Sequence, residues 1–138
     1  MASKVISIQA TIEADINKVW EYWNLPSHII NWNFASNEWH CPKASNDLRV
    51  GGKLSSRMEA KDGSFGFDFG ATYTAVIPHK KISYKMDDGR NATIKFEDLG
   101  KHTKILIDFE AETENPIEMQ RDGWQAILNN FKDYVEKN

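Results

Sequence analysis

The C-terminal stretch NPIEMQRDGWQAILNNFKDYVEKN, residues 115–138, decides the fold. At 100° per residue its large apolar side chains fall on one stripe, and its charged and amide side chains fall on the opposite side. The stripe consists of Ile117, Trp124, Ile127, Leu128, Phe131, Tyr134 and Val135. This pattern predicts one long amphipathic helix, whose apolar stripe has to lie against another apolar surface of the chain.

The residues before this helix show the two-residue period of strands. Apolar and polar side chains alternate in several runs, separated by turn sequences rich in Asp and Gly. These runs are 4–12, 53–60, 65–77, 82–86, 92–96 and 105–109. In the longest run the inward set is Phe65, Phe67, Phe69, Ala71, Tyr73, Ala75 and Ile77. Since one face is polar throughout, we expect an antiparallel sheet with a single buried face.

Two short helices and a long loop are expected after the first strand. Asp15 is suited to cap a helix over residues 16–23, and Pro26 can begin a second helix because its missing N–H does no harm there. Residues 33–49 contain few apolar side chains and predict an irregular loop. Since loops of this length are often functional, it could cover a binding site as a lid.

Size and charge narrow the class of protein. A chain of 138 residues fits one domain, here 1–138, and its net charge of −3 argues against a nucleic-acid partner. The single cysteine, Cys41, cannot form an internal disulfide, and neither a signal peptide nor a membrane-spanning run is visible. We therefore expect a cytoplasmic protein that is a monomer or a weak homodimer.

Several short motifs resemble one known family. They begin with the tryptophans around Pro26 and end in the C-terminal helix. The motifs are Trp20, Trp23 and Trp32, then Asp47-Leu48-Arg49-Val50-Gly51-Gly52, Met58, Asp62-Gly63, and Gly123-Trp124 with Leu128. Over residues 5–137 the chain resembles the activator-of-heat-shock-ATPase homologue family, within the START and SRPBCC superfamily of ligand-binding proteins.

The resemblance implies both a fold and a cavity. The fold is α+β, the helix-grip fold, in which a curved antiparallel sheet of about seven strands wraps around a long C-terminal helix, with two short helices after the first strand. Members of the superfamily surround a deep hydrophobic cavity, and some are cyclases or hydratases. The family name comes from a co-chaperone, so a chaperone partner is also implied, although we do not expect the separate domain that contacts the chaperone in that protein to fit into 138 residues.

The predicted lining of the cavity combines strand positions that face inward with residues of the helices and the loop. These are Trp32, Trp39, Ser56, Met58, Phe67, Phe69, Tyr73, Tyr84, Met86, Gln120, Trp124 and Ile127. Apolar walls with a few polar groups are typical of sites for small molecules. The alternative is that these side chains pack against the helix and leave no space.

Two residues of the C-terminal helix, Gln120 and Gly123, are expected to have different roles. Gln120 falls within the apolar stripe, and its amide needs a partner, which could be a ligand, Tyr84 or a backbone carbonyl. Gly123 would let the helix approach another backbone closely. With Ser56, Tyr73 and Tyr84, Gln120 would orient a bound molecule.

No catalytic or metal-binding constellation is evident. His40 and Cys41 are neighbours in an extended segment and should point to opposite sides. Glu59 and Asp68 share the polar face of the sheet with Arg57, so a solvated surface cluster is expected there. No spacing typical of metal ligands occurs, and strand parity places no titratable group in the cavity. We therefore expect no catalytic residues, metal or cofactor.

Three functions remain open at this point. The first is a binding protein for a small hydrophobic molecule, held between the sheet and the C-terminal helix. The second is a cyclase- or hydratase-like enzyme that polarises a carbonyl group through a tyrosine or glutamine hydrogen bond. The third is a protein-interaction module that associates with a chaperone, and an exposed apolar patch on the outer face of the sheet would favour it.

Overall fold

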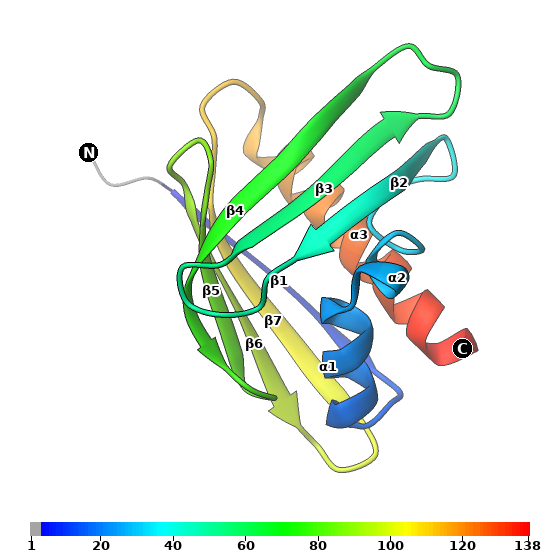
Figure 1. The fold of residues 1–138 in the computed structure, drawn as a ribbon, viewed down its shortest axis with the longest axis vertical. Coiled ribbons are helices and arrows are strands. Elements are labelled where there is room, and N and C mark those ends of the chain that lie inside the picture. The colour runs from blue at the N-terminus through cyan, green and yellow to red at the C-terminus, as the bar shows by residue number, and fades with distance from the viewer. Residues whose placement is uncertain (1–3) are drawn as a thin grey trace.

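Residues 4–138 form one antiparallel sheet with three helices in the computed structural model (Figure 1). The elements are β1 (Val5–Ile12), α1 (Ile16–Asn24), α2 (Pro26–Ile29), β2 (Trp39–Asn46), β3 (Lys53–Ala60), β4 (Gly66–Ile77), β5 (Lys81–Met86), β6 (Asn91–Asp98), β7 (Thr103–Glu110) and α3 (Ile117–Lys137). Asp15 caps α1 by accepting a hydrogen bond from Lys18 N at 2.9 Å, and Pro26 occupies the first turn of α2, both as predicted.

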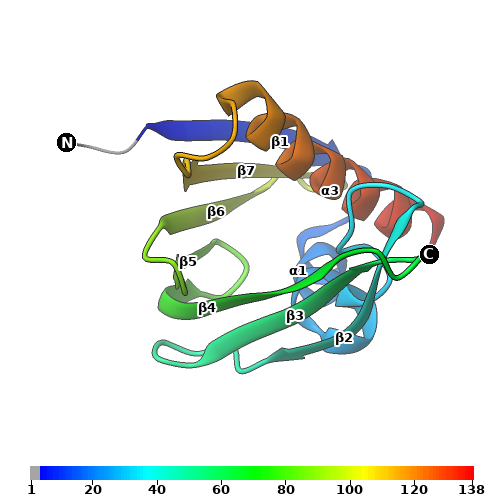
Figure 2. The same ribbon diagram turned by 90° about the horizontal axis from the view of Figure 1, so that it is seen from above.

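The strand order is β1-β7-β6-β5-β4-β3-β2, with every neighbouring pair antiparallel. Figure 2 shows the sheet curling from β1 and β7 around to β3 and β2, with the helices on its concave side and α3 alongside β1. This is the predicted α+β helix-grip architecture. Within residues 4–138 no helix is both long and apolar enough to cross a membrane.

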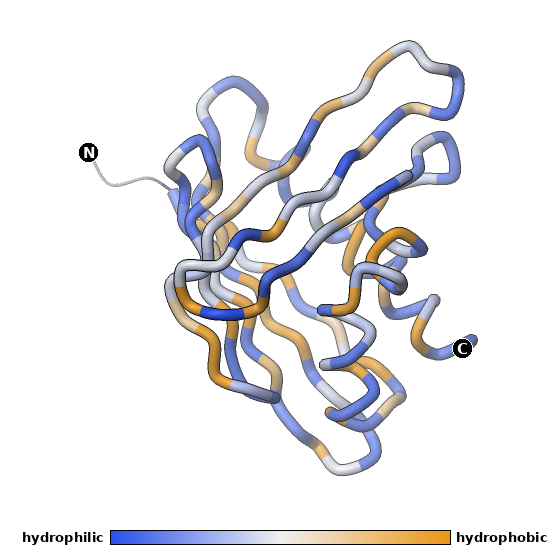
Figure 3. The backbone as a smooth tube through the Cα atoms, in the orientation of Figure 1, coloured by the Kyte–Doolittle hydropathy of each residue, from blue (hydrophilic) through white to orange (hydrophobic). Residues whose placement is uncertain are grey.

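The core lies between the concave face of the sheet and the apolar stripe of α3. Strand alternation is visible as alternating colours along several strands in Figure 3. Ile94, Ile105 and Phe109 are almost fully buried on the inner face, and Leu128, Phe131 and Val135 of α3 are buried against them. The predicted helix stripe is therefore confirmed.

The prediction of an irregular loop over residues 33–49 is wrong for its second half. Trp39–Asn46 forms the edge strand β2, which pairs with β3. Pro42 lies where the pairing register shifts between His40 and Lys43, and an edge position with a bulge tolerates the missing N–H of proline. Since β2 belongs to the sheet, these residues cannot form a free lid.

The predicted inward set of the longest strand is also wrong at its end. A register shift in the β4–β5 pairing separates Tyr73 from Ala75, and beyond it Val76 pairs with the buried Ile82. Val76 packs against the core, whereas Ile77 is 47% exposed. One extra residue reverses the faces of all that follow, which sequence alternation alone cannot reveal.

Candidate functional site

A pocket of about 250 Å³ lies between the concave face of the sheet and the helices. Its walls come from α1, α2, the segment after α2, strands β3, β4, β5 and β7, the residue just before β6, and α3. The lining residues are Trp23, Asn24, Ile29, Trp32, Asn33, Leu54, Ser56, Met58, Phe67, Phe69, Tyr73, Ile82, Tyr84, Arg90, Ile107, Trp124, Ile127 and Leu128. Apolar and aromatic side chains dominate this lining, with a few polar groups among them.

The structure brings most of the predicted site residues to this pocket. The residues that line it are Trp32, Ser56, Met58, Phe67, Phe69, Tyr73, Tyr84, Trp124 and Ile127. Trp39 and Gln120 line a neighbouring groove instead, and Met86 is buried without lining the pocket or the groove. Strand parity selected these strand positions, but it cannot distinguish a residue that faces a space from one that is packed against neighbours.

Two polar atoms of the pocket have no hydrogen-bond partner among residues 4–138. They are Ser56 Oγ on β3 and Asn24 Oδ1 at the end of α1, and both residues are buried. The amide of Asn24 is oriented by its Nδ2, which donates to Trp20 O at 2.9 Å. Buried polar atoms nearly always have partners, so these two atoms are exceptions, and both are almost completely covered by protein atoms although their residues line the pocket.

A chain of hydrogen bonds fixes the wall beside Asn24. Tyr73 donates its hydroxyl hydrogen to Asn46 Oδ1, and Asn46 Nδ2 donates to Asn24 O at 2.7 Å. These contacts connect β4 to the edge strand β2 and to the end of α1. Because the Tyr73 hydrogen is already engaged, its hydroxyl remains available to a bound molecule chiefly as an acceptor.

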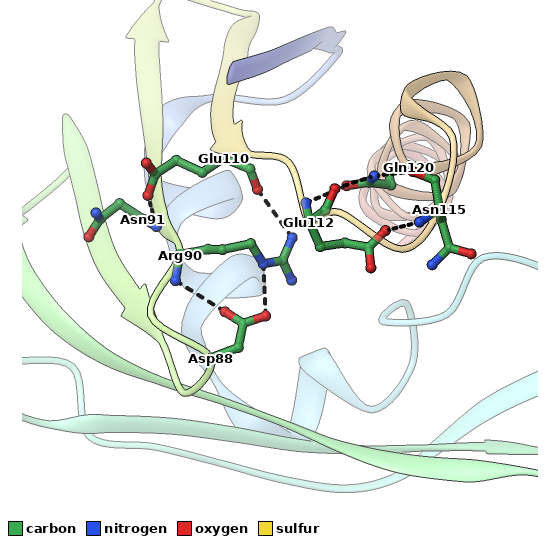
Figure 4. A network of polar contacts seen from close by, with 7 residues as sticks. All are labelled: Asp88, Arg90, Asn91, Glu110, Glu112, Asn115 and Gln120. Atoms are coloured by element: carbon green, nitrogen blue, oxygen red, sulfur yellow. Dashed lines mark hydrogen bonds and ion pairs between the residues drawn. The ribbon is translucent and has the colours of Figure 1, made fainter. Parts of the chain in front are cut away.

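Gln120 does not orient anything in the pocket. Its Oε1 accepts from Glu112 N at 2.9 Å, and its Nε2 donates to Glu112 O at 3.1 Å and to Asn115 O at 2.8 Å. Figure 4 shows the amide directed into the segment that precedes α3. Of the predicted alternatives, the backbone carbonyl is the partner, and Gln120 holds the β7–α3 connection in place.

Arg90 is the charged residue of the pocket that sequence analysis missed, and it corrects, together with Tyr73 and Tyr84, the prediction of a cavity without titratable groups. It follows the hairpin turn at Gly89, whose φ of 95° suits a residue without a Cβ. Arg90 Nε donates to Asp88 Oδ2 at 2.8 Å and Nη1 donates to Glu110 O at 3.1 Å (Figure 4). Ala92 faces inward, so continuing the two-residue alternation of the strand back from Ala92 would have placed Arg90 on the same face.

Tyr84 lies beside Arg90 on the same inner face. Tyr84 pairs with Ala92 and Met86 N bonds to Arg90 O, so the side chains of Tyr84 and Arg90 lie diagonally across two adjacent strands. Burial raises the pKa of Tyr84 well above the ordinary tyrosine value, and nearby Tyr73 adds to the rise while Arg90 opposes it. The hydroxyl therefore stays protonated and can donate.

An apolar groove adjoins the pocket on the side of α3 and the β3–β4 hairpin. Met58, Phe67, Trp124 and Ile127 line both the pocket and the groove, so the two are continuous. The rings of Trp39 and Phe65 meet edge to face with centroids 6.0 Å apart, and Phe65 is 62% exposed. The groove gives the pocket an apolar path to the surface.

Gly123 also lines this groove, and the prediction that it allows a close backbone approach is wrong. A Cβ built at Gly123 would meet no atom within 4 Å. The glycine is therefore not required by packing against another backbone.

The other charged or nucleophilic candidates lie away from the pocket. Cys41 is buried, and burial raises the pKa of its thiol, while His40 points away to within 3.7 Å of Glu59. Arg57 pairs with Glu59 at 2.9 Å and with Asp68 at 3.5 Å on the polar face. The expected surface cluster is thus confirmed.

The pairing of Asp47 with Arg49, before Gly51-Gly52, forms a second surface contact. Arg49 Nε lies 3.0 Å from Asp47 Oδ2, and both side chains are largely exposed. This ion pair shapes the β2–β3 connection and takes no part in the pocket.

Comparisons with known proteins agree with this architecture. An AHSA1-like protein from Aeromonas hydrophila, solved by solution NMR, is 46% identical over 97% of this chain and 93% of that chain, with a TM-score of 0.91. The protein Chr148 from Cytophaga hutchinsonii is 50% identical over 96% of this chain and 92% of its own, with a TM-score of 0.82. CV1439 from Chromobacterium violaceum, 24% identical over 98% and 99% of the two chains, has a TM-score of 0.85 and shares the fold.

A search of curated proteins gave no match. A model of the family described as "Activator of Hsp90 ATPase homolog 1-like protein" matches residues 13–136, which include α1, α2, all of α3 except its last residue, and six of the seven strands. The chain therefore belongs to the family of activator of Hsp90 ATPase homolog 1-like proteins.

Proposed function

We propose that this protein binds a small hydrophobic molecule in the pocket between the sheet and α3. The observation that carries the proposal is the pocket itself, because apolar side chains form most of its wall and Tyr84 and Arg90 are among the few polar residues that line it. Sites for small molecules combine an apolar wall with a few placed polar groups in this way. Burial of apolar surface would supply the affinity at about 25 cal/mol per Å² before ordering costs.

The second candidate is the cyclase- or hydratase-like enzyme, and Arg90 is the observation that favours it. A guanidinium beside the Tyr84 hydroxyl can stabilise negative charge that develops on a carbonyl oxygen. Proton transfer would also need a base, and the described lining residues include neither a carboxylate nor a histidine. Binding without turnover therefore has the stronger support. For the chaperone-associated module, the support is the family description.

Titration with naphthalene, monitored by two-dimensional NMR, tests the binding function. An apolar cavity of about 150 Å³ holds benzene, so a pocket of about 250 Å³ should admit a two-ring hydrocarbon. We expect saturable shifts confined to residues around the pocket, such as Met58, Tyr84 and Ile127. Native mass spectrometry of protein purified from its own host would then give the mass of the natural ligand.

Two variants that add the same ring, one inside the pocket and one on the surface, test where naphthalene binds. Ile127→Phe adds volume inside the pocket, whereas Asn129→Phe adds the same ring on the exposed side of α3. The first variant should lose naphthalene binding and the second should retain it. Equal binding by both variants, or no saturable shift in the wild type, would exclude the pocket as a ligand site.

A further inference from the structure

The Tyr84 hydroxyl is a hydrogen-bond donor that faces the pocket without an acceptor. Tyr84 lines the pocket from β5 and is 7% exposed. Its hydroxyl makes no hydrogen bond within residues 4–138, yet it is not enclosed by protein atoms as the unpartnered Ser56 Oγ is. A buried hydroxyl that is neither bonded nor enclosed borders open space, so a molecule in the pocket can reach the Tyr84 hydroxyl.

Aromatic neighbours hold the Tyr84 ring without using its hydroxyl. The ring meets those of Phe69 and Tyr73 edge to face, with centroid distances of 6.1 and 6.2 Å. Tyr73 donates its own hydroxyl hydrogen to Asn46 Oδ1. Burial keeps Tyr84 protonated, because it raises the pKa of this group well above that of an ordinary tyrosine. Tyr84 is therefore a fixed donor, and a ligand without an acceptor would leave it unsatisfied.

Arg90 places a positive charge close to this donor. Its side chain lies diagonally across two strands from Tyr84, a separation that long side chains can bridge, and its charge opposes the rise in the Tyr84 pKa. Asp88 and the Glu110 carbonyl engage Nε and Nη1, while Nη2 has no hydrogen-bond partner among residues 4–138. The negative end of a carbonyl dipole is therefore favoured at this part of the wall.

The ion pair of Arg90 favours a neutral acceptor over a carboxylate. Arg90 is the one charged side chain among the described residues that line the pocket, and Asp88 Oδ2 already lies 2.8 Å from its Nε. An ionised ligand acid would lose its hydration without meeting an unpaired cation, and a buried charge is costly under those conditions. A ketone or ester oxygen accepts the same hydrogen bond without that cost.

A carbonyl also fits better than a ligand hydroxyl. A hydroxyl brings a hydrogen of its own, which needs a second acceptor once it is buried. The two unpartnered oxygens of the wall, Asn24 Oδ1 and Ser56 Oγ, are covered by protein atoms and cannot easily serve as that acceptor. A carbonyl oxygen accepts from Tyr84 and adds no donor to the apolar interior.

We infer that the ligand carries a neutral carbonyl group, whose oxygen accepts a hydrogen bond from the Tyr84 hydroxyl beside Arg90. This inference rests on the proposed binding function and specifies its ligand class. The apolar remainder of the pocket, about 250 Å³ in all, holds the hydrocarbon body of the molecule. The inference separates this class from pure hydrocarbons, which leave the donor unsatisfied, and from ionised acids.

A pair of isosteric ligands tests the contact by isothermal titration. In 2-acetylnaphthalene and 2-isopropenylnaphthalene a carbonyl oxygen replaces a methylene group of nearly the same size. The ratio of their affinities should fall by about tenfold in Tyr84→Phe, because only the ketone loses a hydrogen bond. The transfer of each compound from water is the same for both proteins, so it cancels from this comparison.

Tyr22→Phe is the matched control. It makes the same change on α1, outside the residues that line the pocket, where the hydroxyl contacts Asn138 O at 3.4 Å. The affinity ratio should be that of the wild type in this variant. Unchanged naphthalene binding by Tyr84→Phe is the expected check that its pocket remains intact.

The infrared stretching frequency of the bound ketone reports the hydrogen bond directly. A hydrogen bond lowers the frequency of a carbonyl stretch, so 2-acetylnaphthalene labelled with ¹³C at its carbonyl should absorb at a lower frequency in the protein than in hexane. Tyr84→Phe should return the frequency towards the hexane value, and Tyr22→Phe should leave it lowered. A wild-type frequency equal to that in hexane would overturn the contact without any variant.

The outcomes separate this inference from the function on which it rests. If naphthalene, the alkene and the ketone all fail to bind, the binding function itself fails. If they bind but the affinity ratio is the same in the wild type and Tyr84→Phe, the pocket is a ligand site and the carbonyl contact is wrong. If naphthalene-2-carboxylate at neutral pH binds more tightly than the ketone, the ligand class is an acid.

Discussion

The rings of Phe109 and Trp124 stack with their centroids 3.9 Å apart and their planes 9° from parallel. Phe109 is a buried residue of β7, and Trp124 lies on the second turn of α3. Trp124 also lines both the pocket and the groove that leads to it. One side chain therefore attaches the helix to the sheet and forms part of the wall of the candidate site.

Replacing Trp124 with alanine should destabilise the protein and enlarge the pocket. The change removes the stack on Phe109 and leaves a void at the mouth of the pocket, and large-to-small changes of this kind cost about 2–4 kcal/mol at a partly buried site. Urea denaturation measures the loss. Met119→Ala, at a position 62% exposed on the same helix, should change stability by less than about 0.5 kcal/mol. Similar values for the two variants would contradict the anchoring role of Trp124.

Gly123→Ala should stabilise the protein, because alanine favours the helix and nothing lies where its Cβ would be. The open space around Gly123 means that the substitution introduces no clash. We expect a gain of about 0.5–1 kcal/mol, measured by urea denaturation, from the lower conformational freedom of the unfolded chain. A loss of stability would indicate that the glycine is needed for a packing contact.

The fold was largely predictable because its signals are local and periodic. The helix stripe from Ile117 to Val135 and the alternation in β6 and β7 each follow from one burial face. What failed depends on pairing between distant segments. β2 has a weak pattern and forms because β3 supplies its hydrogen bonds, and the bulge after Tyr73 is set by the register with β5.

The candidate site was predictable only as a set of inward positions. Parity placed Ser56, Tyr73 and Tyr84 on the concave face, but it could not show that Tyr73 is engaged by Asn46 while Ser56 has no partner within the described chain. Arg90 was missed because it lies in the turn just before β6, where the alternating strand pattern is interrupted. Hydrogen-bond partners depend on three-dimensional placement, which one sequence does not contain.

Stability should fall steeply at alkaline pH because of the two tyrosines of the pocket. Burial raises the pKa of both Tyr73 and Tyr84, so the unfolded chain loses these protons at a lower pH than the folded protein does. Below the ordinary tyrosine pKa of about 10, the two tyrosines contribute fully to the free energy of unfolding. As the pH rises above that value, the free energy of unfolding falls by up to about 1.4 kcal/mol per pH unit for each tyrosine. Urea denaturation between about pH 8 and 11 measures the slope.

Tyr84→Phe removes one of these two ionisations and should reduce that alkaline slope by about half, with other titrating groups unchanged between the two proteins. Equal slopes for the wild type and the variant would show that Tyr84 ionises in the folded protein as readily as in the unfolded chain.

Gln120→Leu should loosen the connection between β7 and α3. The amide makes three hydrogen bonds to backbone atoms of Glu112 and Asn115, and leucine would leave these atoms without that partner in a partly buried position. We expect a loss of about 1.5–3 kcal/mol by urea denaturation and faster amide hydrogen exchange in this segment. Met119→Leu, at a position 62% exposed on the same helix, is the control. An unchanged exchange rate at Glu112 would contradict the role of Gln120.

Ser56→Ala tests whether the buried Ser56 hydroxyl lacks a hydrogen-bond partner in the protein. The Ser56 hydroxyl is buried without a partner among residues 4–138, and an unsatisfied buried group costs about 1–3 kcal/mol. Ser55→Ala, one residue away on the exposed face of β3, has the same change in strand propensity without the buried hydroxyl. In urea denaturation Ser56→Ala should therefore be more stable than Ser55→Ala, by about 1 kcal/mol. The opposite order would contradict the absence of a hydrogen-bond partner for the Ser56 hydroxyl.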